Sequence, residues 1–203
     1  MAYFFTRILM YPLMRLFFVK QITGINNLPK KTPYILAANH ASYIDGVLMF
    51  LTILWYKNKP VHILIYKEFF KTWFKRFFFL TLYKQMQANH SVDHAVQYLI
   101  NNELVGIFPE GGRTKTGKIK KVTHSGLAVM ALETGLPVVP VGIEGTYELW
   151  SRYQKWPKLK RLVTIRIGKP IKFNLKMNKK NYKTVTSKVM KSIAKLAKEE
   201  YKW

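Results

Sequence analysis

The sequence predicts an α/β fold, in which a mixed, partly parallel sheet is flanked by helices. Apolar runs of strand length alternate along the chain with longer runs of helical length, and this alternation is typical of α/β domains. The 203 residues are enough for one domain with a buried core. No internal repeat and no Gly/Ser-rich or Pro-rich linker divides the chain. We therefore expect one main domain.

The predicted strands are short apolar runs at residues 34–38, 61–66, 104–108, 138–142 and 162–168. The predicted helices cover residues 47–56, 92–100 and 125–134, and Gly135 is expected to end the third of them. A closing amphipathic helix is predicted over residues 179–203, with its apolar residues on one face and most of its lysines on the others.

The charge of the chain indicates a polyanionic partner. Lys and Arg total 34 against 10 acidic residues, which gives a formal net charge of +24. Charge alone does not choose between a nucleic acid and an anionic bilayer, but the five tryptophans and many other aromatic residues favour a membrane interface. The absence of cysteine excludes disulfides, thiolate metal sites, cysteine nucleophiles and iron–sulfur clusters.

Residues 3–19 are rich in Phe, Leu, Ile and Met, but Arg7, Pro12 and Arg15 interrupt the run. A membrane-spanning helix needs about 20 mostly uncharged residues, and no small-residue cleavage site follows, so neither a span nor a signal peptide is predicted. We expect a kinked amphipathic helix or helix pair lying in a membrane interface; the alternative is a helix packed on its own domain. A polar turn at residues 23–29 follows. The predicted organisation is an N-terminal interfacial helical segment at residues 1–28 and a main domain at residues 29–203.

His40 and Asp45 come directly after the predicted strand 34–38, where an α/β sheet presents its functional loops. If His40 lies on the turn and Asp45 at the start of the next helix, the carboxylate can hold one imidazole nitrogen while the other takes a proton from a hydroxyl. The alternative is a capping Asp beside an ordinary surface His. Ser42 lacks the glycine-flanked turn of a hydrolase nucleophile and is expected to support the turn instead.

A second group of polar and glycine residues follows the predicted strand 104–108. Its members are Glu110, Gly111, Gly112, Arg113 and Thr114. The glycines allow close backbone approach, Arg113 offers a fork for phosphate, and the Glu110 carboxylate can accept hydrogen bonds from hydroxyls. This pattern predicts a substrate-binding turn suited to a phosphate group.

Two further patterns are incomplete. Residues 112–118 match the spacing of a nucleotide-binding loop, but Ile119 stands where a Mg²⁺-binding Ser or Thr is required. His90 and His94 have a spacing that can hold a metal in a helix, but no third ligand is evident. No metal site is predicted.

Three blocks, taken in order, resemble the signature of the glycerolipid acyltransferases. They are residues Asn39 to Asp45 with a His-x4-Asp motif, Phe108 to Arg113, and Val139 to Val141. The resemblance extends from about Gly24 to Gly168 and is greatest to the 1-acylglycerol-3-phosphate (lysophosphatidate) acyltransferases. It implies direct transfer of an acyl group from acyl-CoA or acyl carrier protein to the free hydroxyl of a lysophospholipid, without an acyl-enzyme and without a cofactor.

The resemblance also implies roles for particular residues. His40 would be the general base and Asp45 its orienting partner, while Glu110, Gly111 and Arg113 would bind the glycerol phosphate. The acyl-donor side would be lined by Val139, Pro140 and Val141. The expected partner surface is an anionic phospholipid membrane, with the protein peripheral on its cytoplasmic face and no nucleic acid bound.

One departure bears on the acceptor. Similar acyltransferases carry an additional motif that ends in an Arg, whereas residues 82–89 contain no Arg and Lys84 is their only cation. Lys lacks the planar fork of Arg, so another lysophospholipid or glycerolipid acceptor is an alternative. The sequence is also compatible with a non-catalytic basic module that binds membrane or nucleic acid, and with an esterase that uses the same His.

The unusually aromatic residues 69–83 have helical spacing. They are open to three interpretations, which are core, an acyl-chain wall and a second membrane contact.

Overall fold

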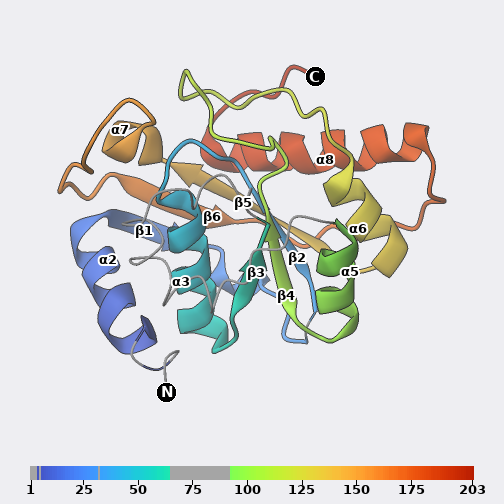
Figure 1. The fold of residues 1–203 in the computed structure, drawn as a ribbon, viewed down its shortest axis with the longest axis horizontal. Helices are drawn as coiled ribbons and strands as arrows, with labels where there is room; N and C mark the ends of the chain where they lie inside the picture. Colours follow the sequence, from blue (N-terminus) through green and yellow to red (C-terminus); the bar gives the residue numbers. More distant parts are fainter. Residues whose placement is uncertain (1–3, 5, 32, 65–91) are drawn as a thin grey trace.

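The computed structural model describes residues 4, 6–31, 33–64 and 92–203, and these form a six-stranded sheet with helices on both faces (Figure 1). The strands are β1 (Val19–Thr23), β2 (Ile35–Ala38), β3 (Val61–Ile63), β4 (Leu104–Ile107), β5 (Val138–Glu144) and β6 (Val163–Ile167). Their order is β1-β6-β5-β2-β4-β3. All neighbouring strands are parallel except β5 and β6, which are antiparallel. The predicted mixed α/β sheet is confirmed.

Two core clusters cover the two faces of the sheet, and alternate residues of β2 divide between them. Leu36 and Ala38 pack with α3 (Asp45–Lys57) and α2 (Tyr11–Phe17). Ile35 and Ala37 pack with α5 (Val92–Ile100), α6 (Gly126–Thr134) and α8 (Lys179–Ala197). Because both faces of the central strands are buried, the strands appear in the sequence as continuous apolar runs.

Most predicted elements agree with the structure to within a few residues, and the helix at residues 92–100 agrees fully. Helix α3 begins at Asp45, two residues before the predicted start, and α6 ends at Gly135, whose φ of 63° is left-handed as expected of a helix-ending glycine. Strand β3 is shorter than predicted. A short helix, α7 (Thr146–Trp150), and two short turns of helix, η1 (Thr6–Met10) and η2 (Ile25–Asn27), were not predicted as separate elements.

The predicted closing helix is wrong for its last residues. Helix α8 ends at Ala197, because Lys198 adopts a left-handed φ of 57° and its N–H turns back to the carbonyls of Ala194 and Lys195. The chain then returns to the domain, where Tyr201 is buried and the Glu199 carboxylate accepts a hydrogen bond from the Ile119 N–H. The sequence carries no glycine at this position to mark the end of the helix.

The N-terminal residues are helical only up to Phe17. The expectation of a helical segment over residues 1–28 is wrong for Val19–Thr23, which form β1 and pair in parallel with β6 at the edge of the sheet. The β-branched Val19 and Thr23 and the intervening Ile22 suit a strand, a pattern that the preceding apolar run obscures in the sequence. The boundary after residue 28, between an interfacial segment and the main domain, stays a prediction.

Helix α2 presents two different faces. Tyr11 and Met14 are buried, and the Tyr11 ring stacks on Trp55 of α3 at 4.6 Å. Large apolar side chains on the other side of η1 and α2 are exposed: Phe4, Ile8, Leu9, Leu13, Leu16 and Phe17. In the described part of the chain, no helix has both the length and the apolar character needed to cross a bilayer. The predictions made for residues 69–83, 82–89 and His90 lie outside the described residues.

Candidate active site

The His40 turn and the Glu110 turn follow neighbouring parallel strands, so both lie at the carboxyl edge of the sheet. The first follows β2 and the second follows β4, which is paired with β2. The Thr114 N–H donates to the His40 carbonyl at 2.9 Å. The structure thus brings together the two groups of residues that the sequence singled out, at the edge where functional loops were expected.

The Asp45 carboxylate organises the first turn. Its Oδ2 atom lies 2.8 Å from Nδ1 of His40 and accepts the N–H groups of Ala41 and Ser42, each at 2.7 Å. Asp45 is the first residue of α3 and is fully buried, and a negative charge at a helix N-terminus is favourable. Of the two alternatives in the sequence, the structure favours orientation of the imidazole, because the Asp45 carboxylate bonds His40 and the turn before α3 and makes no capping bond to the helix itself.

The His40 ring is held on its edge and on its face. Because Nδ1 bonds the carboxylate, it carries the proton in the neutral imidazole, and Nε2 is the nitrogen with a lone pair for a hydroxyl. One face of the ring stacks on Phe108, with the centroids 4.2 Å apart and the planes 18° apart. The side chain keeps 19% of its surface exposed. This arrangement suits a general base that a substrate can reach.

Both carboxylate oxygens of Glu110 are hydrogen-bonded to the main chain. Oε1 accepts the N–H of His40 at 2.7 Å, and Oε2 accepts the N–H of Lys120 at 2.8 Å. Burial raises the pKa of Glu110 to about 7, although the two N–H groups and the Lys120 charge act in the opposite direction. Glu110 thus holds the N–H of His40, and Thr114 holds its carbonyl, so the backbone of His40 is fixed on both sides.

The glycine turn requires glycine at one of its two positions. Gly111 has a left-handed φ of 68°, and an added Cβ would lie 3.0 Å from the His124 ring. At Gly112 an added Cβ would meet only the flexible end of Lys120, at 3.9 Å. The His124 ring therefore packs beside this turn. The hydroxyl-bearing Thr114 is buried, and its N–H and Oγ1 serve the turn.

Arg113 stacks on an aromatic ring from the first turn. Its guanidinium carbon lies 3.4 Å from the centre of the Tyr43 ring, and Tyr43 in turn packs at 5.3 Å on Trp150. Within the described part of the structure, the buried Nη1 of Arg113 forms no hydrogen bond. A guanidinium held in place on an aromatic face, in the turn that is bonded to the His40 carbonyl, is suited to bind an anion.

Comparison with known proteins gives the family. The model of the Acyltransferase family matches residues 20–144, which is more than half of the chain. The chain belongs to the acyltransferase family. The matched range contains His40, Asp45, the Glu110 turn and β5.

Individual relatives agree with this assignment. The chain is 30% identical over 131 residues to a protein of Cocos nucifera named 1-acyl-sn-glycerol-3-phosphate acyltransferase, covering 60% of this chain and 40% of that protein. It is 26% identical over 124 residues to a protein of the same name from Bacillus subtilis, covering 59% of each. The chain thus spans about half the length of these curated relatives.

A solved structure extends the agreement to the fold. The crystal structure of the 1-acyl-sn-glycerophosphate (LPA) acyltransferase from Thermotoga maritima matches with a TM-score of 0.66 and 26% identity. The match covers 89% of this chain and 73% of the Thermotoga chain.

Three further residues, Asn39, Ser42 and Trp150, support the candidate site, and the sequence suggested a structural role only for Ser42. The Asn39 side chain exchanges two hydrogen bonds of 2.8 Å with the Ile143 backbone, which fixes the end of β2 against β5. The buried Ser42 hydroxyl donates to the Trp150 carbonyl at 2.6 Å, so it supports the turn as predicted. Trp150 lies beyond the range of the family match, and only its position in the fold reveals its link to the site.

The residues expected on the acyl-donor side lie inside the sheet. Val139, Pro140 and Val141 are in β5, paired with residues 36–38 of β2, and all three are buried. They lie in the strand that pairs with β2, and β2 leads directly into the His40 turn. Their role on the donor side stays a prediction.

A second histidine–carboxylate pair was also not predicted. His62, in the middle of β3, bonds through Nε2 to Glu103 and stacks on Tyr98 with the ring centroids 4.0 Å apart. The two residues are 41 positions apart, so nothing in the local sequence connects them. Among the described residues, no group of three or more His, Asp and Glu side chains is placed to hold a metal ion.

Proposed function

We propose that this acyltransferase moves a fatty acyl group from an acyl thioester to the free hydroxyl of a lysophospholipid. The acceptor we favour is 1-acylglycerol-3-phosphate, and the product is then phosphatidate. The observation that carries the proposal is the His40–Asp45 pair at the carboxyl edge of the sheet, with the Glu110–Thr114 turn bonded to it through the Thr114 N–H and the His40 carbonyl. The names of the relatives from Cocos nucifera, Bacillus subtilis and Thermotoga maritima support the choice of acceptor.

In the proposed reaction, His40 Nε2 takes the proton of the acceptor hydroxyl as that oxygen attacks the thioester carbonyl. A C–O bond forms, the C–S bond breaks, and the imidazolium returns the proton to the leaving thiolate. The buried Asp45 carboxylate stabilises the imidazolium through Nδ1. No acyl-enzyme is needed, and the Ser42 hydroxyl is already engaged by the Trp150 carbonyl.

We propose that Arg113 binds the acceptor phosphate and that Glu110 acts by positioning His40. Arg113 is held on Tyr43, and its buried Nη1 bonds no described residue, which supports a role in binding an anion such as phosphate. Glu110 already accepts two main-chain N–H groups, one of them from His40, which supports a positioning role. Because residues 82–89 contain no Arg, a lysophospholipid with another headgroup is the second candidate acceptor.

We further propose that the reaction takes place at the surface of an anionic membrane, with the protein peripheral on its cytoplasmic face. The exposed apolar side of η1 and α2 and the net charge of +24 support lipid contact. Acyl-CoA and acyl carrier protein are both candidate donors, and no further cofactor is needed for the proposed chemistry.

The test is an activity panel of both donors against several lysophospholipids in anionic vesicles, with His40→Ala and a matched control, His62→Gln. We expect His40→Ala to lower the rate of lipid product formation by roughly 10³-fold, the size of a general-base contribution. His62→Gln should stay within about twofold of wild type, since His62 lies in the middle of β3, bonds Glu103 and stacks on Tyr98, neither of which belongs to the two turns of the site. Full activity in His40→Ala would remove the mechanism.

The same panel separates the remaining candidate functions. Thioester consumed without a lipid product would indicate an esterase. Lipid or oligonucleotide binding with no turnover of any donor would indicate a binding module. A preference for a headgroup other than phosphate would keep the reaction and replace the acceptor.

A further inference from the structure

The loop between α7 and β6, residues 151–162, presents apolar and basic side chains together. It contains five cations and no acidic residue; the cations are Arg152, Lys155, Lys158, Lys160 and Arg161. Between them, Tyr153, Trp156 and Leu159 are 69%, 66% and 73% exposed. These are among the most exposed large apolar side chains of the described residues, and they fall within seven positions of one another.

This exposure is not caused by a lack of internal structure in the loop. The Lys158 N–H donates to the Leu149 carbonyl at 2.9 Å, and the Ser151 N–H donates to the Gln154 side chain at 2.6 Å. The Trp150 indole N–H donates to the Gln154 carbonyl at 3.2 Å. Backbone hydrogen bonds therefore hold the loop in place while three of its large apolar side chains stay exposed. Exposure of so much apolar surface to water is unfavourable.

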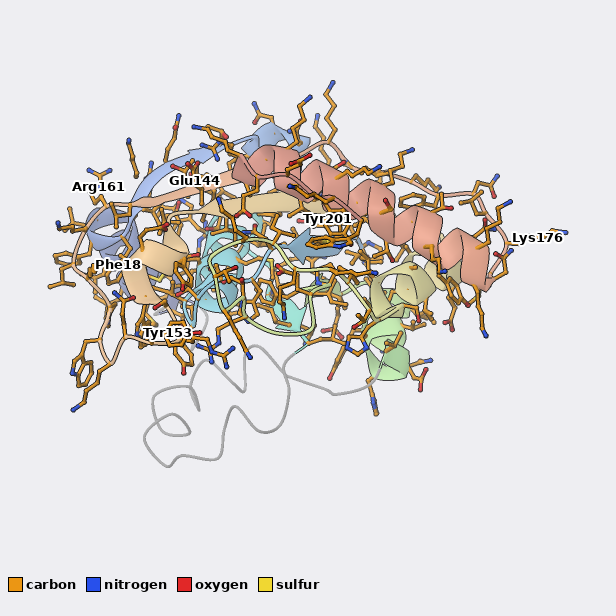
Figure 2. The ribbon with its side chains drawn as sticks, turned by 90° about the horizontal axis from the view of Figure 1, so that it is seen from above. Phe18, Glu144, Tyr153, Arg161, Lys176 and Tyr201 are labelled. Atoms are coloured by element: carbon orange, nitrogen blue, oxygen red, sulfur yellow. The ribbon has the colours of Figure 1, made fainter. Side chains whose placement is uncertain are left out.

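The end of the loop contacts the chain where it leaves the N-terminal helix α2. The Val163 N–H donates to the Phe18 carbonyl at 2.9 Å, and the Arg161 side chain donates to the Val19 carbonyl at 3.3 Å. Figure 2 shows Phe18, Arg161 and Tyr153 at the same end of the molecule. The loop thus ends beside residues 18 and 19, directly after α2, whose Leu13, Leu16 and Phe17 are exposed.

We infer that the 151–162 loop is a second lipid-contact surface, which docks on an anionic bilayer beside α2. Trp156, Tyr153 and Leu159 enter the boundary between headgroups and acyl chains, and the five cations meet anionic headgroups. A nucleic acid would match the charge and could stack on the aromatic rings, but it has no use for Leu159 or for the aliphatic side of α2. The combination of cations, interfacial aromatics and aliphatic side chains favours lipid.

The loop is coupled to the candidate active site through Trp150. The Trp150 carbonyl accepts the Ser42 hydroxyl, and the Trp150 ring packs on Tyr43, which holds Arg113. Docking of the loop would therefore fix the height of the His40 turn above the bilayer. The inference concerns lipid binding, and it rests on the proposed function only in taking the bilayer as the place where the acceptor is met.

The experiment measures binding of the full-length chain to zwitterionic vesicles and to vesicles that contain phosphatidylglycerol. Two sets of loop substitutions are compared. The apolar set is Trp156→Ala with Leu159→Ala, and the charged (lysine) set is Lys155→Gln with Lys158→Gln and Lys160→Gln. Matched controls alter residues elsewhere on the surface, Ile100→Ala for the apolar set and Lys180→Gln with Lys183→Gln and Lys191→Gln for the charged set. All altered side chains lie at the surface, so the variants are expected to fold.

We expect each set of loop variants to weaken binding to anionic vesicles by roughly tenfold, and the controls to stay within about twofold. High salt should reduce the effect of the lysine set and leave that of the apolar set. Wild-type binding by both loop sets would overturn the inference, and so would equal losses in loop and control variants. Weakened oligonucleotide binding with unchanged vesicle binding would assign the surface to nucleic acid instead.

The outcome is separable from that of the proposed function. His40→Ala should bind vesicles as the wild type does, because His40 lies outside the loop. Loss of vesicle binding in the loop variants, together with no transfer by the wild type, would leave the inference standing and remove the proposed reaction. The reverse pattern, active transfer and unaltered vesicle binding in every loop variant, would remove the inference alone.

Discussion

The described part of the chain contains the histidine–carboxylate pairs His40–Asp45 and His62–Glu103, which differ in which partner is accessible. In the pair His40–Asp45 the imidazole side chain is 19% exposed and the carboxylate is fully buried. In the pair His62–Glu103 the imidazole is 8% exposed and the carboxylate is 41% exposed. The first pair therefore exposes its histidine, and the second exposes its carboxylate.

The positions of the two histidines in the sheet explain the difference. His40 lies just beyond the end of β2, where the backbone leaves the sheet and a side chain can project from its edge. His62 is the middle residue of β3, with its ring stacked on Tyr98 and its Nδ1 buried without a hydrogen-bond partner among the described residues. A histidine–carboxylate contact is therefore weak evidence of catalysis, and its place at the carboxyl edge of the sheet carries more information.

The largest expected difference between the pairs concerns the charge of the carboxylate. Asp45→Asn keeps an oxygen that can accept from Nδ1 and the two N–H groups, but it removes the charge that stabilises the imidazolium. We expect kcat to fall by roughly 10³-fold, about 4 kcal/mol in the barrier. Glu103→Gln should change kcat by less than about twofold. Comparable losses of kcat in both variants would show that the two pairs are not functionally distinct.

The buried Glu110 carboxylate of the site also predicts a pH dependence of stability. Burial raises the pKa of Glu110 to about 7 from its ordinary value of 4.5, so the folded state binds the proton more tightly than the unfolded chain. The stability contributed by this proton is fully present below pH 4.5 and is lost as the pH rises through about 7. The change amounts to about 3 kcal/mol at most.

Glu110→Gln tests this pH dependence because it removes the titrating group. The free energy of unfolding of wild type and variant, measured by denaturant at several pH values, should differ by an amount that varies between pH 4.5 and 7. A constant difference across that range would contradict the raised pKa of Glu110.

The smallest expected effect distinguishes the two tyrosines that stack at these sites. Tyr43→Leu removes the ring under Arg113, and we expect the acceptor KM to rise by about fivefold, roughly 1 kcal/mol, with kcat little changed. Tyr98→Leu removes the ring under His62 and should leave the acceptor KM within about twofold of wild type. Steady-state kinetics over a range of acceptor concentrations checks both. An equal KM effect would place Tyr98 within reach of the acceptor site.

The sequence predicts local features well, because it records backbone periodicity and the residues of each turn. The alternation of apolar runs gives the mixed sheet, and the His40–Asp45 contact joins residues only five positions apart. The edge strand β1 was missed, because Val19–Thr23 directly continue an apolar helical run. The end of α8 was missed because Lys198 carries no local signal for a left-handed conformation.

The sequence by itself determined which residues carry the proposed chemistry and which turns hold them. Only the tertiary structure decided what those residues touch: Glu110 bonds His40 from 70 positions away, and Ser42 bonds Trp150 from 108 positions away. The same is true of His62 and Glu103, and of the loop at residues 151–162 beside α2. These contacts depend on the order of the strands, which the packing of both faces of the sheet sets and which no short stretch of sequence records.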